Sequence, residues 1–148
     1  MKTLWQNIGI VAFWALLPAL HIYLRIGRRT RVAVTHDKHL LVVKPWLGNG
    51  KWSLPGGGVH RSENPTQAVK RELFEETGVK ADKLRLVQAL RYRQSGLRFD
   101  YDLFLYKQYE HVSIRKQAWE LVEAAWRPID ELSSKNSNHD VVSAKQWL

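Results

Sequence analysis

The sequence contains no cysteine, so disulfide bonds and thiolate metal sites are excluded. Internal repeats and low-complexity tracts are also absent, which excludes repeat architectures and long disordered arrays. A chain of 148 residues can bury one hydrophobic core, and it is too short for two domains of typical size.

Acidic residues are missing from the first 36 positions, which hold five of the 23 Lys and Arg residues. The rest of the chain carries 18 basic side chains against 14 acidic ones, so about half of the net charge of +9 belongs to this short segment. A sequence pI near 10.0 would suit nucleic-acid binding. About half of the excess of basic residues lies at the N-terminal end, where it can flank a membrane segment. We therefore expect no nucleic-acid partner.

That end of the chain is apolar as well as basic. Thr3–Leu24 is an uncharged run of 22 residues, and at about 1.5 Å per residue one helix of this length would cross a hydrocarbon core. We expect a single membrane-spanning helix, with an interfacial anchor or an apolar helix packed on the domain or a partner as alternatives. The basic residues that follow place the rest of the chain in the cytoplasm by the positive-inside rule: Arg25, Arg28, Arg29 and Arg31. The alternative localisation is a soluble cytoplasmic protein.

After residue 30 the pattern changes to alternating apolar and polar residues, which predicts strands over 31–36, 39–44, 84–93, 98–109 and 120–127. A terminal amphipathic helix is expected over 140–148. Arginine and aromatic residues alternate over 91–99, which would suit stacking on bases. The plainer interpretation is a hairpin with one buried face and a charged edge. The order of elements predicts a mixed sheet between helices.

The most informative stretch is Leu54–Lys80, a glycine-rich turn followed by a short helix. Three glycines follow Pro55, and such a backbone can expose several N–H groups toward an anion. Asn64 is placed as the N-cap, with Pro65 and Gln67 at the first and third helical positions. Gly78 provides the helix end.

This helix carries an unusual amount of acid. Glu72, Glu75 and Glu76 are spaced by three and four residues, which places them on one side of the helix, where like charges repel. A solvated acidic face is one explanation. The other is that hard cations such as Mg²⁺ or Mn²⁺ complete the site, because these ions prefer carboxylate oxygens and substrate phosphates.

The same residues resemble the Nudix box, G-x5-E-x7-R-E-U-x-E-E-x-G-U, where U is aliphatic. All nine fixed positions match: Gly57, Glu63, Arg71, Glu72, Leu73, Glu75, Glu76, Gly78 and Val79. The resemblance implies an α/β fold of the Nudix type, an α/β/α sandwich with a mixed sheet, preceded here by the N-terminal apolar helix. We therefore expect an anchor over residues 1–28 and a Nudix hydrolase domain over 29–148.

The resemblance also implies roles for individual residues. The expected catalytic residues are Glu76, Glu75 and Glu120, with Glu123 as a competitor for Glu120. The expected metal-binding residues are Glu72, Glu75, Glu76 and Gly57, and the expected phosphate-binding residues are Gly56, Gly57 and Gly58. Glu63 and Arg71 are expected mainly to hold the loop and the helix together.

The activity implied by the resemblance is Mg²⁺- or Mn²⁺-dependent hydrolysis of a diphosphate linkage in a nucleoside diphosphate derivative, such as a nucleoside triphosphate or a nucleotide sugar. The alternative is a non-catalytic nucleotide-binding or regulatory module. Such modules usually lose a carboxylate of the box, and none is missing here. Substrate choice depends on residues outside the box, chiefly 45–51, 86–106 and the C-terminal segment, and the sequence does not identify the substrate.

Overall fold

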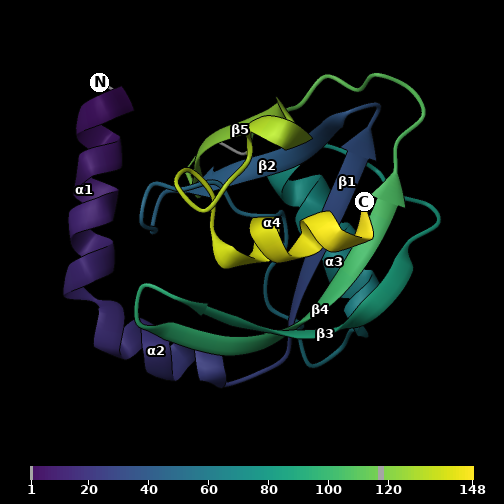
Figure 1. Cartoon of the computed structure of the whole chain (residues 1–148). Coiled ribbons are helices and arrows are strands. Elements are labelled where there is room, and N and C mark those ends of the chain that lie inside the picture. The colour runs from purple at the N-terminus through teal and green to yellow at the C-terminus, as the bar shows by residue number, and fades with distance from the viewer. Residues whose placement is uncertain (1, 117–118) are drawn as a thin grey trace.

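The computed structural model describes residues 2–116 and 119–148 (Figure 1). Two helices come first, α1 (Lys2–Ala15) and α2 (Leu17–Arg25). The rest of the described chain forms β1 (Arg29–His36), β2 (His39–Pro45), α3 (Pro65–Thr77), β3 (Arg85–Gln94), β4 (Leu97–Lys107), β5 (Leu121–Pro128) and α4 (His139–Ala144). Short 3₁₀ turns follow at Ile129–Glu131 and Lys145–Trp147.

The five strands form one mixed sheet in the order β3-β4-β1-β2-β5. The β1–β4 pair is parallel, and the other neighbouring pairs are antiparallel. Asp37 takes a positive φ of 50° in the β1–β2 turn, and Ser95 and Gly96 form the β3–β4 turn. The predicted strands and their connections are confirmed, with ends that differ by one or two residues.

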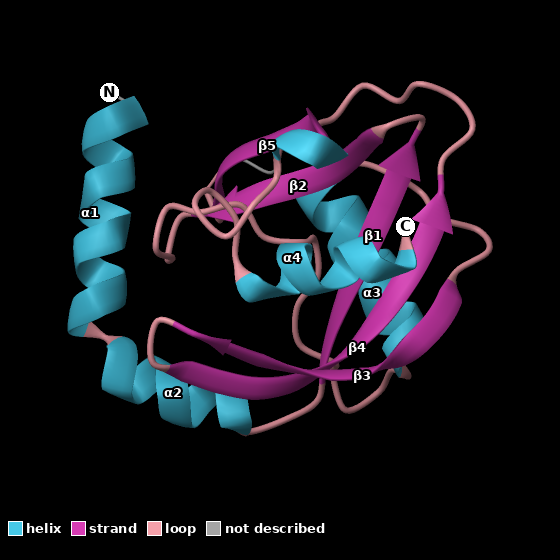
Figure 2. Cartoon of the chain, in the orientation of Figure 1, coloured by secondary structure: helices cyan, strands magenta, loops and turns pink. Residues whose placement is uncertain are grey.

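Helices cover both faces of this sheet (Figure 2). On one face, Val69 and Leu73 of α3 pack with Val32, Val34 and Phe104 from the strands. On the other face, α4 and the N-terminal helices pack against a second cluster that contains Tyr101 and Leu103. Alternate residues of β4 therefore serve opposite layers, as the period-2 pattern predicts. The α/β/α sandwich is confirmed.

The N-terminal apolar run is not one continuous helix. It breaks at Leu16, and the axes of α1 and α2 differ by 73°. Pro18 is the physical reason, because proline lacks the N–H of a helical hydrogen bond and its ring clashes with the carbonyl four residues earlier. Among the described residues, neither helix alone is long and apolar enough to cross a membrane, whereas the bent pair would qualify by length and composition only. The expected single membrane-spanning helix is therefore not confirmed, and membrane spanning stays a prediction.

Both helices pack on the domain that follows them. The Phe13 side chain is 4% exposed and belongs to the core on the α4 side of the sheet. Leu17, Leu20 and Leu24 of α2 pack against the same cluster. Residues 1–28 and 29–148 thus share a hydrophobic core over the part that the structure describes, from which Met1 is left out. The division into an anchor and a domain stays a prediction.

Candidate active site

Helix α3 and the loop before it have the local structure that the sequence predicts. The Asn64 side chain accepts a hydrogen bond from the Gln67 backbone N–H at 2.9 Å, and the Gln67 side chain accepts one from the Asn64 backbone N–H at 2.9 Å. Gly78 ends the helix in the left-handed region, with φ of 75°. This reciprocal capping fixes where α3 begins, and with it the direction of each glutamate on the helix.

Arg71 connects the loop to the helix. Its guanidinium donates two hydrogen bonds to Glu63, at 2.6 and 3.1 Å, and one to the Gly58 carbonyl oxygen at 3.1 Å. The same group donates to Glu72 at 2.9 Å and to Glu75 at 3.1 Å. Hydrogen bonding to Arg71 lowers the pKa of Glu63 to about 2. This geometry is what a scaffolding role for Glu63 and Arg71 requires, and the role itself stays a prediction.

Two glycines let carboxylates approach the loop backbone. A Cβ atom on Gly57 would overlap the Glu72 carboxyl group, so only glycine allows that carboxylate to lie against the loop. The Gly56 N–H donates a hydrogen bond to Glu76 Oε2 at 2.9 Å, and Gly56 itself has a φ of 138°. The glycine turn therefore holds Glu72 and Glu76 close to its backbone.

Glu76 has the most perturbed carboxyl group of the site. Its pKa is raised to about 8, mainly by desolvation of its partly buried side chain and also by the negative charges of Glu72 and Glu120. The Gly56 N–H and the positive charge of Arg31 act in the opposite direction. A carboxylate with a raised pKa is stabilised by a positive charge bound beside it. A strongly shifted pKa in a cavity therefore indicates a candidate functional site.

These residues line one cavity of about 300 Å³. Its wall includes Glu72, Glu76 and Glu120 together with Gly56 and Gly57. Glu120 reaches this position just before β5, where its carbonyl oxygen accepts a hydrogen bond from the Trp46 N–H at 2.8 Å. Three carboxylates from two separate elements therefore share one cavity.

Other expected site residues lie elsewhere. The Glu75 side chain is 48% exposed, pairs with Arg71 and does not line the cavity. Glu123, the competitor of Glu120, pairs with Lys44 at 3.4 Å and also lies outside it. Gly58 is not part of the lining either, and its carbonyl oxygen is bound to Arg71. Of the three box glutamates, Glu72 and Glu76 thus point toward the cavity, whereas Glu75 is exposed to solvent.

The donor set fits a hard divalent cation. Glu72, Glu76 and Glu120 offer carboxylate oxygens, which Mg²⁺ and Mn²⁺ prefer, and the Gly57 cradle leaves Glu72 free of steric hindrance. Over residues 2–116 and 119–148, no group of three or more acidic or histidine side chains is already drawn together tightly enough to form a metal centre. The glutamates lining this cavity are the residues that would hold the ion.

Arg31 is a candidate site residue that the sequence does not indicate, because its place in the basic segment after the apolar run suits the flank of a membrane span. It lies on β1 with its side chain 15% exposed, and it lines the same cavity as the glutamates. Its Nε atom lies 3.3 Å from Asp140 Oδ2, and that carboxylate also accepts a hydrogen bond from the Leu54 N–H at 3.0 Å. A cation beside three carboxylates is suited to bind phosphate oxygens. In the sequence, Arg31 is one of four arginines that follow the apolar run, and nothing distinguishes it as a phosphate-binding residue.

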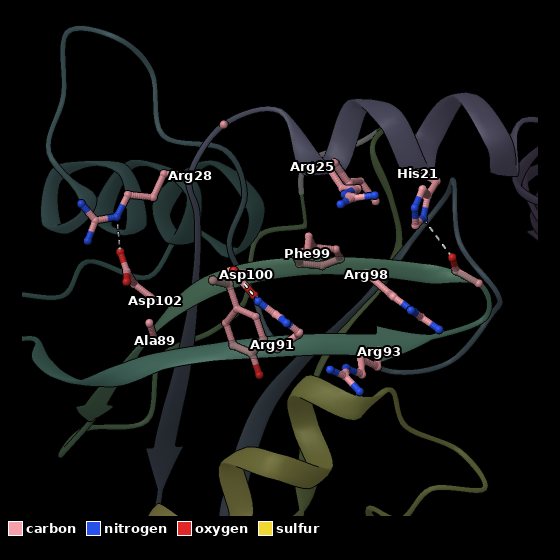
Figure 3. Close-up of a pocket in the computed structure, with 14 residues that line it drawn as sticks. His21, Arg25, Arg28, Ala89, Arg91, Arg93, Arg98, Phe99, Asp100 and Asp102 are labelled. Atoms are coloured by element: carbon pink, nitrogen blue, oxygen red, sulfur yellow. Dashed lines mark hydrogen bonds and ion pairs between the residues drawn. The ribbon is translucent and has the colours of Figure 1, made fainter.

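A second, larger cavity of about 840 Å³ lies between α2 and the β3–β4 hairpin. Figure 3 shows Arg25 and His21 of α2 above the two strands that carry Arg91, Arg93 and Arg98. Its ion pairs are Arg28 with Asp102 at 2.7 Å and Arg91 with Asp100 at 2.8 Å. Within the described part of the chain, Arg25, Arg93 and Arg98 make no ion pair. We call this surface the arginine groove. It contains none of the box glutamates.

Comparison with known proteins gives one family. The family model described as the NUDIX domain matches residues 25–148. The Arabidopsis thaliana protein named Nudix hydrolase 6 is 35% identical over 116 residues, which cover 72% of this chain and 40% of that protein. The chain thus spans less than half the length of this curated relative.

Two solved structures support the same fold. The MutT NUDIX hydrolase from Burkholderia pseudomallei superposes with a TM-score of 0.71 at 22% identity, over 81% of this chain and 95% of that one. The NUDIX domain of Shewanella oneidensis NrtR, crystallised with ADP ribose, has a TM-score of 0.69 at 17% identity, over 81% and 84%. At these identities the likeness concerns the fold alone.

Proposed function

The chain belongs to the Nudix hydrolase family, and we propose that it is a divalent-metal-dependent hydrolase that cleaves the diphosphate linkage of a nucleoside diphosphate derivative. The observation that carries this proposal is the convergence of Glu72, Glu76 and Glu120 on one cavity with Arg31 and the glycine turn. A diphosphate is a polyanion, so its hydrolysis needs charge neutralisation and an activated water. The cavity offers groups for both needs.

Each group has a proposed task. Glu72 and Glu76 hold the cation, which when bound neutralises phosphate charge and lowers the pKa of a coordinated water. Arg31 binds phosphate oxygens, and Gly56 and Gly57 bring the loop backbone close to them. Glu120 enters from a different element, and it takes the proton of the attacking water while the bond between phosphorus and the bridging oxygen breaks. The bridging oxygen leaves with the second phosphate group.

The regulatory alternative makes a different prediction. A non-catalytic module would bind a nucleotide without turnover, although its box carboxylates are complete. We would incubate the full chain with ADP-ribose, a nucleotide sugar, a nucleoside triphosphate and a dinucleoside polyphosphate, with and without Mg²⁺, and measure nucleoside monophosphate release. Release that needs both Mg²⁺ and Glu76 supports the enzyme. Tight binding without release from any of the four would favour the module.

We also propose that the N-terminal helices attach this protein to a membrane surface instead of crossing it. Many of their apolar side chains are exposed: Leu4, Trp5, Ile8, Val11, Trp14, Leu16, Ile22 and Tyr23. The arginine groove lies beside α2 and would face anionic headgroups (Figure 3). The bend at Leu16 and the burial of Phe13 are compatible with helices that lie along a surface.

Flotation with vesicles tests this attachment. The full chain should float with vesicles that contain anionic phospholipid and much less with neutral ones. The Arg93→Gln/Arg98→Gln double variant should lose most of this preference, whereas the exposed control pair Arg61→Gln/Lys135→Gln should keep it. Equal flotation of both double variants would refute the role of the arginine groove.

A further inference from the structure

The cavity that contains the glutamates has a second wall from outside the family domain. The NUDIX match begins at residue 25, yet Phe13, Leu20 and Leu24 line the same cavity as Glu72 and Glu76. Two of these three side chains come from α2 and one from α1. The site is therefore completed by a segment that almost entirely precedes the matched domain.

The N-terminal helices also fix the two loops that flank the cavity. Helix α1 contacts residues 45–51, because Trp5 stacks on Trp46 with ring centroids 4.8 Å apart and the Trp46 Nε1–H donates to the Trp5 carbonyl oxygen at 3.0 Å. Helix α2 contacts the β3–β4 turn, where His21 Nδ1 lies 3.0 Å from the Gly96 carbonyl oxygen. The loop 45–51 and the strands next to the β3–β4 turn contribute lining residues, so the helices help to determine the shape of the cavity as well as part of its surface.

Away from the charged groups the lining is apolar. Besides the three N-terminal side chains it includes Leu47, Tyr92, Leu97 and Phe99. The amides that remain are engaged within the protein: Asn49 donates to Asn138 at 2.8 Å, and Asn138 donates to Ser53 at 2.8 Å. A polar sugar placed against this wall would lose hydrogen bonds to water without gaining equivalent ones.

We infer that the wall formed by Phe13, Leu20 and Leu24 binds an apolar group attached to the diphosphate, so that the substrate class is a diphosphate derivative with one hydrophobic end. This inference rests on the proposed function, since it places the diphosphate at Arg31 and the glutamates. The cavity of about 300 Å³ is at the small end of ligand pockets, so the group is short. Apolar burial then contributes to substrate binding before the chemical step.

The test uses two probes with the same anionic part. Adenosine diphosphate carrying a hexyl ester on its terminal phosphate is compared with the methyl ester, each with Mg²⁺ and the full chain. We expect the hexyl ester to have a KM about tenfold lower at similar kcat, since the extra methylenes contact the apolar wall. Leu20→Ala and Leu24→Ala should each remove most of this preference by raising KM for the hexyl ester.

Ile22→Ala is the matched control, because Ile22 lies on the same helix with its side chain 63% exposed and does not line the cavity. This variant should keep the hexyl preference. Equal KM values for both esters in the wild type, or an equal loss of preference in the control, would overturn the inference.

A binding measurement separates this inference from the proposed function. Calorimetry with methylene-bridged versions of the two esters needs no turnover. Tighter binding of the hexyl analogue, lost in Leu20→Ala and kept in Ile22→Ala, supports the apolar wall. If this preference is found but neither of the ordinary esters is hydrolysed, only the proposed hydrolase activity is rejected. Hydrolysis of both esters with no binding preference would reject the apolar wall and leave the hydrolase standing.

Discussion

The two ends of the cavity are built in different ways. At the charged end, Gly56, Gly57, Glu72 and Glu76 come from 21 consecutive residues, joined by a loop and one helix with local hydrogen bonds. At the apolar end, the side chains come from α1, α2, the loop 45–51 and the β3–β4 hairpin. Most of the first end is a local structure that the sequence encodes in one stretch, and only Glu120 and Arg31 join it from elsewhere, whereas the whole second end exists only after the chain has folded. The predictions below separate the two, from the largest expected effect to the smallest.

The largest effect is expected at the charged end. Glu76→Gln should lower kcat by roughly a thousandfold, within the range for loss of a group that acts on the transition state. The glutamine amide oxygen can still accept the hydrogen bond from the Gly56 N–H. The substitution also removes a carboxyl group whose charged form is disfavoured by burial, as its pKa of about 8 indicates. The melting temperature should therefore stay the same or rise. A variant that unfolds, or one with wild-type kcat, would contradict the assignment.

The next effect concerns the apolar end and should appear in stability. Phe13→Ala removes a side chain that is 4% exposed, and loss of such a core aromatic costs about 3–5 kcal/mol of unfolding free energy. Val11→Ala, on the same helix but 68% exposed, should cost less than about 0.5 kcal/mol. Urea unfolding of both variants measures this. Similar stability of the two variants would show that α1 is independent of the domain.

These two ends also show what the sequence could predict. The box, the caps of α3 and the alternation in β4 depend on short-range rules, so the fold class and the position of Glu72 and Glu76 were predictable. The bend at Leu16 was only hinted at by Pro18, because a proline within a long apolar run is tolerated in membrane helices. The roles of Phe13, Leu20 and Arg31 depend on contacts between residues far apart in the chain, which no local pattern records.

A smaller effect is expected for the close approach of Glu72 to the loop. Gly57→Ala should displace the flexible Glu72 carboxyl group and weaken its 2.9 Å hydrogen bond with Arg71, at a cost of about 1 kcal/mol of unfolding free energy. Gly58→Ala is the matched control, because a Cβ there meets no atom within 4 Å. Thermal unfolding of both variants decides this, and equal destabilisation would mean that Glu72 does not depend on the glycine.

The smallest effect concerns the ion pair that holds the loop to the helix. Arg71 lowers the pKa of Glu63 from 4.5 to about 2, so this pair stabilises the fold above pH 4.5 and loses its contribution as the pH falls toward 2. Glu63→Gln should therefore be less stable than the wild type at pH 7. The difference in melting temperature should shrink as the pH is lowered to 3. A difference that is independent of pH would indicate a steric cause instead.

The central claim is that the glutamates of the charged end bind a divalent cation together with a diphosphate, and calorimetry tests it most directly. Mg²⁺ would be titrated into the full chain, alone and with the methylene-bridged hexyl ester, in the wild type and in Glu76→Gln. We predict uptake at millimolar Mg²⁺ or below in the wild type, tighter uptake with the ester present, and loss of both in Glu76→Gln. Absence of Mg²⁺ uptake in the wild type, or identical uptake by the two proteins, would contradict the account.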